Sequence, residues 1–253
     1  MEIFHMDLEF ITDHPAIFIK KERLIAVGDL HIGRDLVLGK SGVHMPNATE
    51  RLIQSILLLS RERKATGIVL MGDVKESLAY PSREEYEELS RFFYELRKLQ
   101  ITITKGNHDP RIEEIVKRLD ASVSVVKELL LEDVALMHGH AMPSGEAMMK
   151  KYLVTAHSHP AIMMNGTYEK AWAVAGIGKN ARKFYEKYNR RIKLVITPAF
   201  NELITGSDLS TGAKFAPLLR NNIFDLKKAK IYSLAKKPLG KVEDYTEIKS
   251  DWA

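Results

Sequence analysis

The segment RLIAVGDLH, residues 23–31, decides how the first part of the chain is interpreted. A short apolar run that ends in Gly-Asp is typical of a buried strand that runs into a turn. Asp29 and His31 follow the run, and residues two apart in an extended chain project in the same direction. The segment therefore predicts a strand that carries a carboxylate and an imidazole at its carboxyl end.

Two similar runs follow, GIVLMGD at residues 67–73 and ITITKG at residues 101–106. Apolar residues at three- and four-residue spacing predict a helix over residues 48–63. A capping box opens a second predicted helix over residues 82–99. Three strands joined by two helices of this length predict a βαβαβ unit with parallel strand pairing.

The pattern changes after a short helix predicted near residues 111–119. Apolar runs with short links then follow: SVSVV, VALMHG, YLVTAHSH, AWAVAG and KLVITPAF. They predict a second, largely β layer, so we expect one α/β domain over residues 1–215 with two facing sheets and helices outside. Residues 216–253 lose this periodicity and predict a basic tail packed on the same domain, with a short strand at KIYSL.

Composition limits the class of protein. The 253 residues are 45% hydrophobic, which is enough for a sizeable core, and they include no Cys. Disulfides and thiolate metal sites are thereby excluded. The start MEIFHMDLEF has no signal-peptide pattern, and no apolar run approaches the roughly 20 residues of a membrane span. We expect a cytoplasmic protein that does not enter a membrane.

The formal net charge of +5 is unevenly spread. In KNARKFYEKYNRRIK, residues 179–193, seven Lys or Arg residues accompany one Glu. Such a stripe suits a phosphate-bearing partner. It is equally the composition of a solvated basic turn and helix end, and binding that weakens steeply with salt would favour the first interpretation.

Histidine and carboxylate residues gather where the predicted strands end. The residues at these positions are Asp29, His31, Asp73, Asn107, His108, His138, His140, His157 and His159. Parallel strands bring their carboxyl ends to one edge of a sheet, which is where ligands bind in open α/β sheets. Packing so many carboxylates and imidazoles without a partner would be costly. The sequence therefore predicts a site for divalent cations.

Formal charge indicates what such a site would attract. With neutral His and Asn ligands, the carboxylates of Asp29 and Asp73 leave two divalent cations with a net charge of about +2, which a bridging hydroxide lowers to about +1. The site would attract an anion and stabilise a transition state that gains negative charge. Nitrogen and oxygen ligands fit Mn²⁺, Fe, Zn²⁺ or Ni²⁺.

Each motif has a structural alternative when it is taken alone. GNHD, residues 106–109, has the composition of a turn, and the HGH and HSH pairs can arise by chance. The ordered set, with each member at a strand end, favours a site. His140 is expected at the rim of the cluster or behind a ligand, rather than as a ligand itself.

The ordered motifs GDLH, GD, GNHD, HG and HSH resemble the calcineurin-like metallophosphoesterase superfamily. GDLHIGR, GDVK, AHSHPA and PAFNELITG give a closer resemblance to archaeal phosphoesterases related to SbcD-type double-strand-break repair nucleases. The resemblance covers roughly residues 20–206 and implies a four-layer α/β/β/α sandwich. Two departures stand out: Ala156 replaces a Gly of the family pattern, and the chain is too short for the capping domain of the repair nucleases. An open site without a lid is therefore expected.

The resemblance also implies a role for each site residue. Asp29, His31 and His159 would hold one metal, and Asp73 would bridge to the second. Asn107, His138 and His157 would complete the second metal site. The resemblance further implies that His108 contacts phosphate or acts as the acid, oriented by Asp109, and it favours Mn²⁺.

The expected activity is phosphoester hydrolysis by a metal-bridging hydroxide. A phosphodiesterase or nuclease-like enzyme acting on nucleic acid or nucleotides is favoured. A phosphomonoesterase is the nearest alternative, and a non-catalytic metal-binding scaffold in a nucleic-acid-processing complex is a third. Arg34 and Lys75, each shortly after a ligand, are expected either to reach the phosphate or to be surface charges.

Overall fold

The predicted βαβαβ unit forms the centre of the first sheet in the computed structural model, which describes residues 8–164, 166–211 and 216–245. Its elements are β3 (Leu24–Val27), α2 (Ala48–Glu62), β4 (Gly67–Leu70), α3 (Arg83–Glu95) and β5 (Gln100–Thr104). The three strands are parallel and in register. Ser82 caps α3 by accepting a hydrogen bond from the backbone N–H of Glu85, as the capping box predicts.

The first sheet extends on both sides of this unit, in the order β1-β2-β3-β4-β5-β6. A hairpin of β1 (Leu8–Phe10) and β2 (Ile17–Ile19) lies antiparallel beside β3. On the other side β6 (Val123–Val126) pairs parallel with β5 after α4 (Ile112–Arg118). The prediction that SVSVV belongs to the second layer was wrong, because α4 is a further crossover helix that returns the chain to the first sheet.

The second sheet has the order β13-β10-β11-β12-β9-β8-β7, and β14 pairs with β11 and with β15. Its strands are β7 (Glu128–Leu130), β8 (Val134–Met137), β9 (Tyr152–Thr155), β10 (Pro160–Met164), β11 (Thr167–Ala175), β12 (Lys193–Ile196), β13 (Ser207–Asp208), β14 (Lys230–Ser233) and β15 (Pro238–Lys241). Strands β8, β9 and β12 are mutually parallel. Their carboxyl ends therefore lie together.

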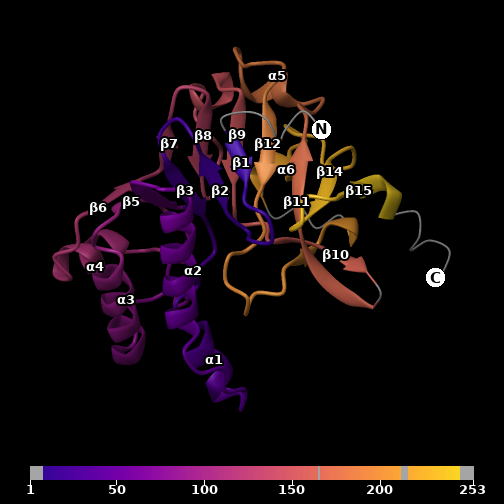
Figure 1. Cartoon of the computed structure of the whole chain (residues 1–253). Helices are drawn as coiled ribbons and strands as arrows, with labels where there is room; N and C mark the ends of the chain where they lie inside the picture. Colours follow the sequence, from indigo (N-terminus) through magenta and orange to yellow (C-terminus); the bar gives the residue numbers. More distant parts are fainter. Residues whose placement is uncertain (1–7, 165, 212–215, 246–253) are drawn as a thin grey trace.

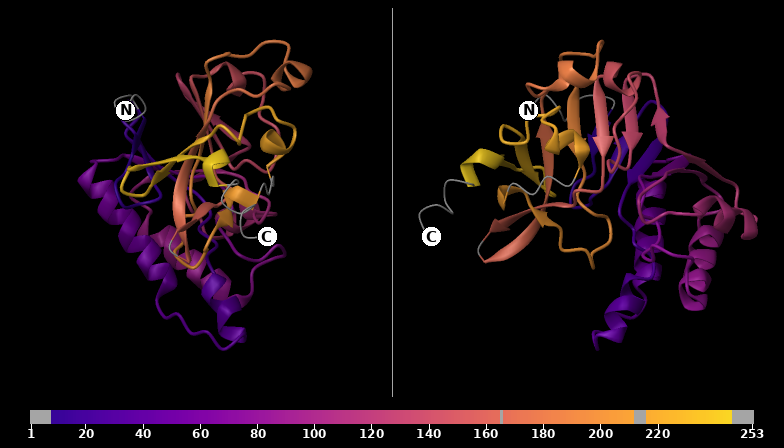
Figure 2. Two further views of the ribbon diagram at one scale, coloured as in Figure 1. Left: turned by 90° about the vertical axis from the view of Figure 1, so that its right-hand side faces the viewer. Right: turned by 180° about the vertical axis from the view of Figure 1, so that it is seen from behind.

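The two sheets and the helices outside them form layers (Figures 1 and 2). Three clusters of buried side chains hold these layers together. One joins α2, α3 and α4 to the outer face of the first sheet. A second lies between the sheets, where Trp172 stacks on Phe10 with ring centroids 4.4 Å apart. The third covers the outer face of the second sheet with α5 (Ala181–Phe184), α6 (Pro217–Arg220) and a short 3₁₀ helix (Ala147–Met149). The predicted fold class, two mixed sheets flanked by helices, is confirmed.

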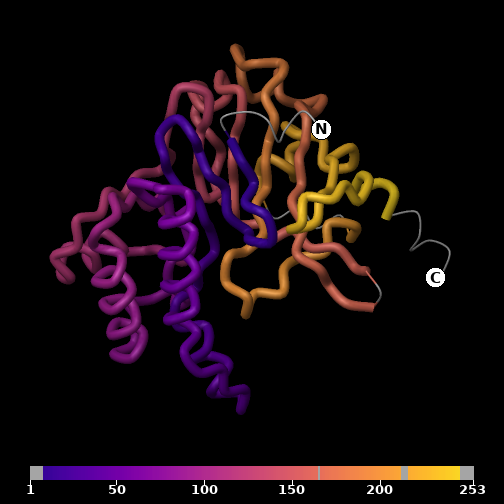
Figure 3. Tube along the Cα trace, viewed as in Figure 1, coloured from indigo at the N-terminus to yellow at the C-terminus, as the bar shows by residue number. Residues whose placement is uncertain are grey.

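The segment predicted as a basic tail contributes to the core of the second layer. Leu218 and Phe224 are fully buried, and β14 coincides with the strand predicted at KIYSL. Figure 3 shows that this segment reaches the hairpin turn between β1 and β2, where the N–H of Asp13 donates to the carbonyl of Leu234. Residues 1–7 and 212–215 of the predicted domain and 246–253 of the predicted tail lie outside the described residues. Among the described residues, no helix is long and apolar enough to cross a membrane.

Candidate metal centre

The turn after β3 places Asp29 and His31 in the left-handed region of backbone space, with φ of 58° and 43°. Few non-glycine residues adopt this conformation, and its strain is found mainly where surrounding structure holds it. The N–H of Asp29 donates to the carbonyl of Gly72, and the N–H of His31 donates to that of Asp73. The side chain of Asn201, from the loop after β12, donates to the carbonyl of Leu30 between them. The turn is thus fixed from both sheets.

The turn after β4 carries Asp73, with φ of 49°, and depends on two glycines. Gly72 has φ of 76°, and a Cβ there would lie 2.5 Å from Nδ1 of His138. A Cβ at Gly106 would lie 2.3 Å from both the backbone nitrogen and Oδ1 of Asp73. Glycine at these positions allows the backbone to approach this closely, and the GD and GN motifs owe their glycines to it.

The turn after β9 carries His157 and His159, again with left-handed φ of 65° and 40°. Ala156, which departs from the family pattern, is fully buried. A Cβ on Gly28 would lie only 2.5 Å from the Ala156 methyl group. The missing side chain of Gly28 therefore provides the space for this methyl.

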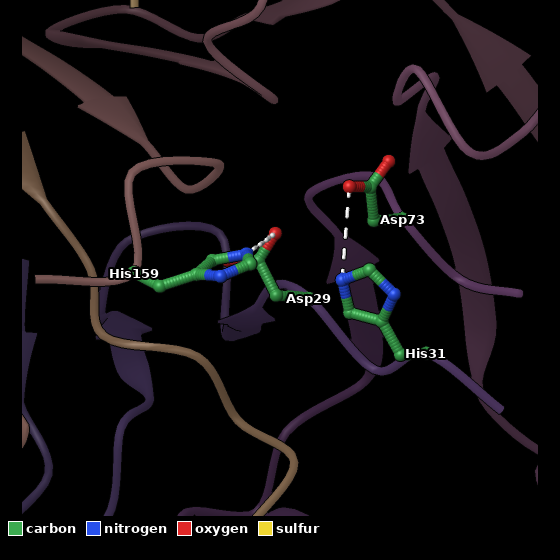
Figure 4. A group of neighbouring side chains, drawn as sticks. All are labelled: Asp29, His31, Asp73 and His159. Atoms are coloured by element: carbon green, nitrogen blue, oxygen red, sulfur yellow. Dashed lines mark ion pairs between the residues drawn. The ribbon is translucent and has the colours of Figure 1, made fainter. Parts of the chain in front are cut away.

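The structure brings Asp29, His31, Asp73 and His159 into one group, with one possible ligand atom of each within 4.8 Å of the others. Figure 4 shows that these side chains converge from the turns after β3, β4 and β9. Nε2 of His159 lies 3.1 Å from Oδ1 of Asp29, and Nε2 of His31 lies 3.7 Å from Oδ2 of Asp73. Both of these nitrogens are buried and have no hydrogen-bond partner among the described residues.

A second group shares Asp73 and adds His138 and His157. Nδ1 of His138 donates to the carbonyl of Met71 at 2.9 Å, so Nε2 is turned towards the group. That Nε2 lies 3.3 Å from Oδ2 of Asp73, 3.1 Å from Oδ1 of Asn107 and 3.1 Å from Nδ1 of His157. Four possible ligand atoms thus surround one small region.

The electrostatics of these two groups favours cation binding. Burial lowers the pKa of His138, but its hydrogen bond with Asp73 and the charge of Asp29 raise it to about 9. Burial and the charge of His138 lower the pKa of His157 to about 4. Burial raises the pKa of Asp73, whereas its hydrogen bond with His138 lowers it well below the ordinary value. A proton on Nε2 of His138 therefore lies between the carboxylate oxygen of Asp73 and the lone pairs of neighbouring ligand atoms. A divalent cation requires the same environment, and nitrogen and oxygen donors fit such ions.

Glu76 is a residue of this site that the sequence did not reveal. One carboxylate oxygen lies 2.8 Å from Nδ1 of His31, and the other accepts from Nη1 of Arg34 at 2.8 Å. A carboxylate on the far nitrogen of a ligating histidine fixes the ring and its tautomer. Burial lowers the pKa of His31, but the Glu76 hydrogen bond and the charge of Asp73 raise it overall. The only sequence signal was its position three residues after Asp73.

His108 and Asp109 differ from the prediction that one orients the other. Nδ1 of His108 donates to the carbonyl of Glu76 at 2.6 Å. The carboxylate of Asp109, fully buried, accepts from the N–H groups of Val74 and Gly106, each at 2.9 Å. The predicted contact was wrong, because both oxygens of Asp109 are engaged with backbone of the two neighbouring turns. Asp109 positions these turns, and the Glu76 carbonyl orients His108.

Both alternatives for Lys75, a contact with phosphate and a surface charge, were also wrong. Its side chain is fully buried, and Nζ donates to the carbonyls of Ser77 and Ala79, so it fastens the loop before α3. Arg34 is half-buried and paired with Glu76, next to the first group. His140 is exposed, and its ring centroid lies 5.2 Å from that of His138, at the rim as expected.

Comparison with known proteins identifies the family. Residues 22–197 match the model of the calcineurin-like phosphoesterase family. Among curated protein sequences, none is significantly similar to this chain. The crystal structure of Pseudomonas putida nuclease MPE is similar with a TM-score of 0.61 and 19% identity, covering 89% of this chain and 92% of that one. YfcE, a phosphoesterase from E. coli, gives a TM-score of 0.37 and 16% identity, with 86% and 97% covered. The chain belongs to the calcineurin-like phosphoesterase family.

Proposed function

We propose that this member of the calcineurin-like phosphoesterase family is a metal-dependent phosphodiesterase that acts on nucleic acid strands or short nucleotides. The observation that carries the proposal is the position of Asp73, whose carboxylate belongs to both ligand groups. A carboxylate shared in this way suits two neighbouring cations, and two-metal sites catalyse displacement at phosphorus.

Each group has its own set of donors. Asp29, His31 and His159 would hold one cation, and Asn107, His138 and His157 the other, with Asp73 common to both. Two divalent cations, when bound, would lower the pKa of a water molecule and offset negative charge on the phosphoryl oxygens. Mn²⁺ is our first choice, and Fe, Zn²⁺ and Ni²⁺ suit the same donors.

His108 is the proposed catalytic residue for proton transfer. The Glu76 carbonyl only accepts hydrogen bonds, so it keeps a proton on Nδ1 of His108 and leaves Nε2 for the substrate. The His108 ring lies against that of His31, with centroids 4.9 Å apart. In the imidazolium form of His108, the N–H of Nε2 would donate a hydrogen bond to a phosphoryl oxygen. Its proton would pass to the leaving oxygen when a water oxygen bonds to phosphorus and the ester bond breaks, and the proton lost by that water would go to solvent.

Accessibility favours a diester over a monoester. Asn107 is exposed and His157 is only half-buried, so the second group faces solvent. His159 of the first group is also only half-buried. A phosphodiester carries an organic group on each side of the phosphorus and needs such an open approach. The fold shared with a nuclease gives a second reason for this preference.

The test compares hydrolysis of bis-p-nitrophenyl phosphate and p-nitrophenyl phosphate, each with Mn²⁺ and with EDTA. We expect Mn²⁺-dependent turnover with higher kcat/KM for the diester, and cleavage of labelled single-stranded DNA under the same conditions. A preference for the monoester would reject the diesterase and favour a phosphomonoesterase. Metal-dependent cleavage of none of these compounds would reject an enzyme and favour a metal-binding scaffold.

A further inference from the structure

A second surface of the protein carries charge that the candidate metal centre does not use. We propose that the basic segment, residues 179–193, binds the phosphate backbone of nucleic acid at the end of the second sheet opposite to the metal centre. The inference concerns binding and holds whether or not the protein cleaves what it binds.

The position of the basic segment separates it from the metal centre. It connects the end of β11 to the start of β12, and Lys193 is the first residue of β12. The loop that follows the other end of β12 contacts the metal centre, where the N–H of Phe200 donates to the carbonyl of Gly28. Figures 1 and 2 show α5, which belongs to the segment, at the far end of these strands. The basic side chains of the segment are therefore too far away to contact a phosphate group bound at Asp73.

The segment is anchored on its inner side. Ala181 and Ile192 are buried, and the hydroxyl of Tyr185 donates to the carbonyl of Pro143 at 2.9 Å. The side chain of Asn189 donates to the carbonyl of Lys150 at 3.0 Å. Because these contacts fix the backbone, the basic side chains project from a surface whose shape is already set, which lowers the entropic cost of binding.

The outer side is almost purely cationic. Seven basic side chains are exposed: Lys179, Arg182, Lys183, Lys187, Arg190, Arg191 and Lys193. None of them forms an ion pair with any described residue, and Glu186 is the one acidic residue within the segment. Unpaired like charges repel one another, and a chain of phosphates relieves that repulsion while releasing its own counterions.

One apolar feature distinguishes nucleic acid from a membrane as the partner. Phe184 is 48% exposed and is the large exposed hydrophobic residue of the segment. A single aromatic ring among cations offers a stacking surface for a base, which single-strand-binding proteins commonly use. Insertion into a bilayer needs a broader apolar face beside the charges, and the segment presents polar residues around Phe184.

The experiment measures binding of fluorescently labelled single- and double-stranded DNA by anisotropy, in EDTA and over a series of salt concentrations. The test variant is Lys179→Gln/Lys183→Gln/Lys187→Gln. The matched control is Lys98→Gln/Lys117→Gln/Lys127→Gln, which removes the same charge from exposed lysines on the first-sheet side. We expect the test variant to lose at least about tenfold in affinity at low salt and to lower the salt slope by about two to three.

The outcomes separate the alternatives. Equal loss in the test and control variants would show that only net charge matters and would overturn the proposal. Salt-independent binding, or binding to anionic vesicles but not to DNA, would also overturn it. Replacing the same three lysines by Arg should keep the affinity, which controls for damage to the fold. Because binding is measured in EDTA, its failure is distinguishable from failure of bis-p-nitrophenyl phosphate hydrolysis with Mn²⁺.

Discussion

Two turns of the same backbone shape, one from each sheet, supply candidate ligands, and their support differs. Asp29 and His31 follow β3, and His157 and His159 follow β9. All four residues have left-handed φ values between 40° and 65°. In the first turn, Glu76 and Asn201 hold the His31 ring and the Leu30 carbonyl from outside the ligand set.

The second turn relies on the site itself for its side chains. Nδ1 of His157 lies against Nε2 of His138, and Nε2 of His159 lies against Asp29. The N–H of His157 also donates to the Asp29 carboxylate at 3.2 Å. The contrast indicates that the first turn is formed before a cation binds, whereas the rings of the second turn depend on what occupies the centre.

Removing the carboxylate of Asp73, which is common to both ligand groups, should have the largest effect. Asp73→Asn keeps the shape but removes the anionic oxygen shared by the two groups, so we expect diester turnover to fall to the metal-free level. Metal content per chain, measured by elemental analysis, should fall as well. Asp120→Asn, at an exposed position, is the control. Full retention of one cation would show that the two ligand groups bind metal independently.

Substitution of His108 should lower turnover without changing either turn. His108→Ala removes the ring that holds the proton for the leaving oxygen, so we expect kcat on the diester to fall about 10²–10⁴-fold. Metal content should stay unchanged, because His108 is outside the proposed ligand set. His140→Ala removes an exposed ring at the rim and should change little. Loss of metal in His108→Ala would place this ring among the ligands.

Substitution of Glu76 tests whether contacts from outside the ligand set matter for the first turn. Glu76→Ala frees the far nitrogen of His31, and the loss of such partners typically weakens metal affinity or activity about 10–100-fold. Glu76→Gln should lose less, because the amide oxygen still accepts from Nδ1 of His31. Titration of Mn²⁺ with activity as the readout measures the apparent affinity. Glu202→Gln, at an exposed position next to Asn201 in the loop after β12, should behave as wild type. Equal effects would contradict the contrast between the turns.

The site residues at strand ends were predictable, because the direction of each strand alone determines at which edge the chain leaves the sheet. Asp29, Asp73 and His138 could be placed at one edge from the apolar runs before them. Lys75 could not, because the sequence does not show whether a side chain next to a ligand turns outwards or into the loop before α3. Asp109 was misassigned for the same reason, since adjacency to His108 says nothing about which backbone groups its oxygens meet.

Prediction of the fold from the sequence had similar limits. The central βαβαβ unit followed from clear helical and strand periodicities, whereas SVSVV was assigned to the wrong sheet because a short strand carries no record of its partner. The C-terminal residues Leu218 and Phe224 are core residues, although short elements such as α6 give too few turns for a periodic signal. Long-range pairing, such as β14 with β11, decides these positions.

The smallest effect we predict, on stability, concerns the second turn in the absence of metal. The pKa of His138 is raised to about 9 from an ordinary value of 6.5, mainly by Asp73 and Asp29 against the opposing effect of burial. A raised histidine pKa stabilises the folded protein fully below about pH 6.5, and this contribution is lost as pH rises towards 9. His157, with its pKa lowered to about 4, stays neutral in that window, and its Nδ1 can accept a hydrogen bond from the protonated Nε2 of His138.

Urea unfolding in EDTA between pH 6.5 and 9 measures this contribution. We expect the free energy of unfolding of the wild type to fall across the window more steeply than that of His138→Gln, which has no proton to lose. Saturating Mn²⁺ should reverse the trend, because a cation needs neutral His138 and its binding releases the proton. Parallel profiles in EDTA would mean that the His138 proton does not hold the second turn. The two turns would then be equally preformed, and the contrast between them would fail.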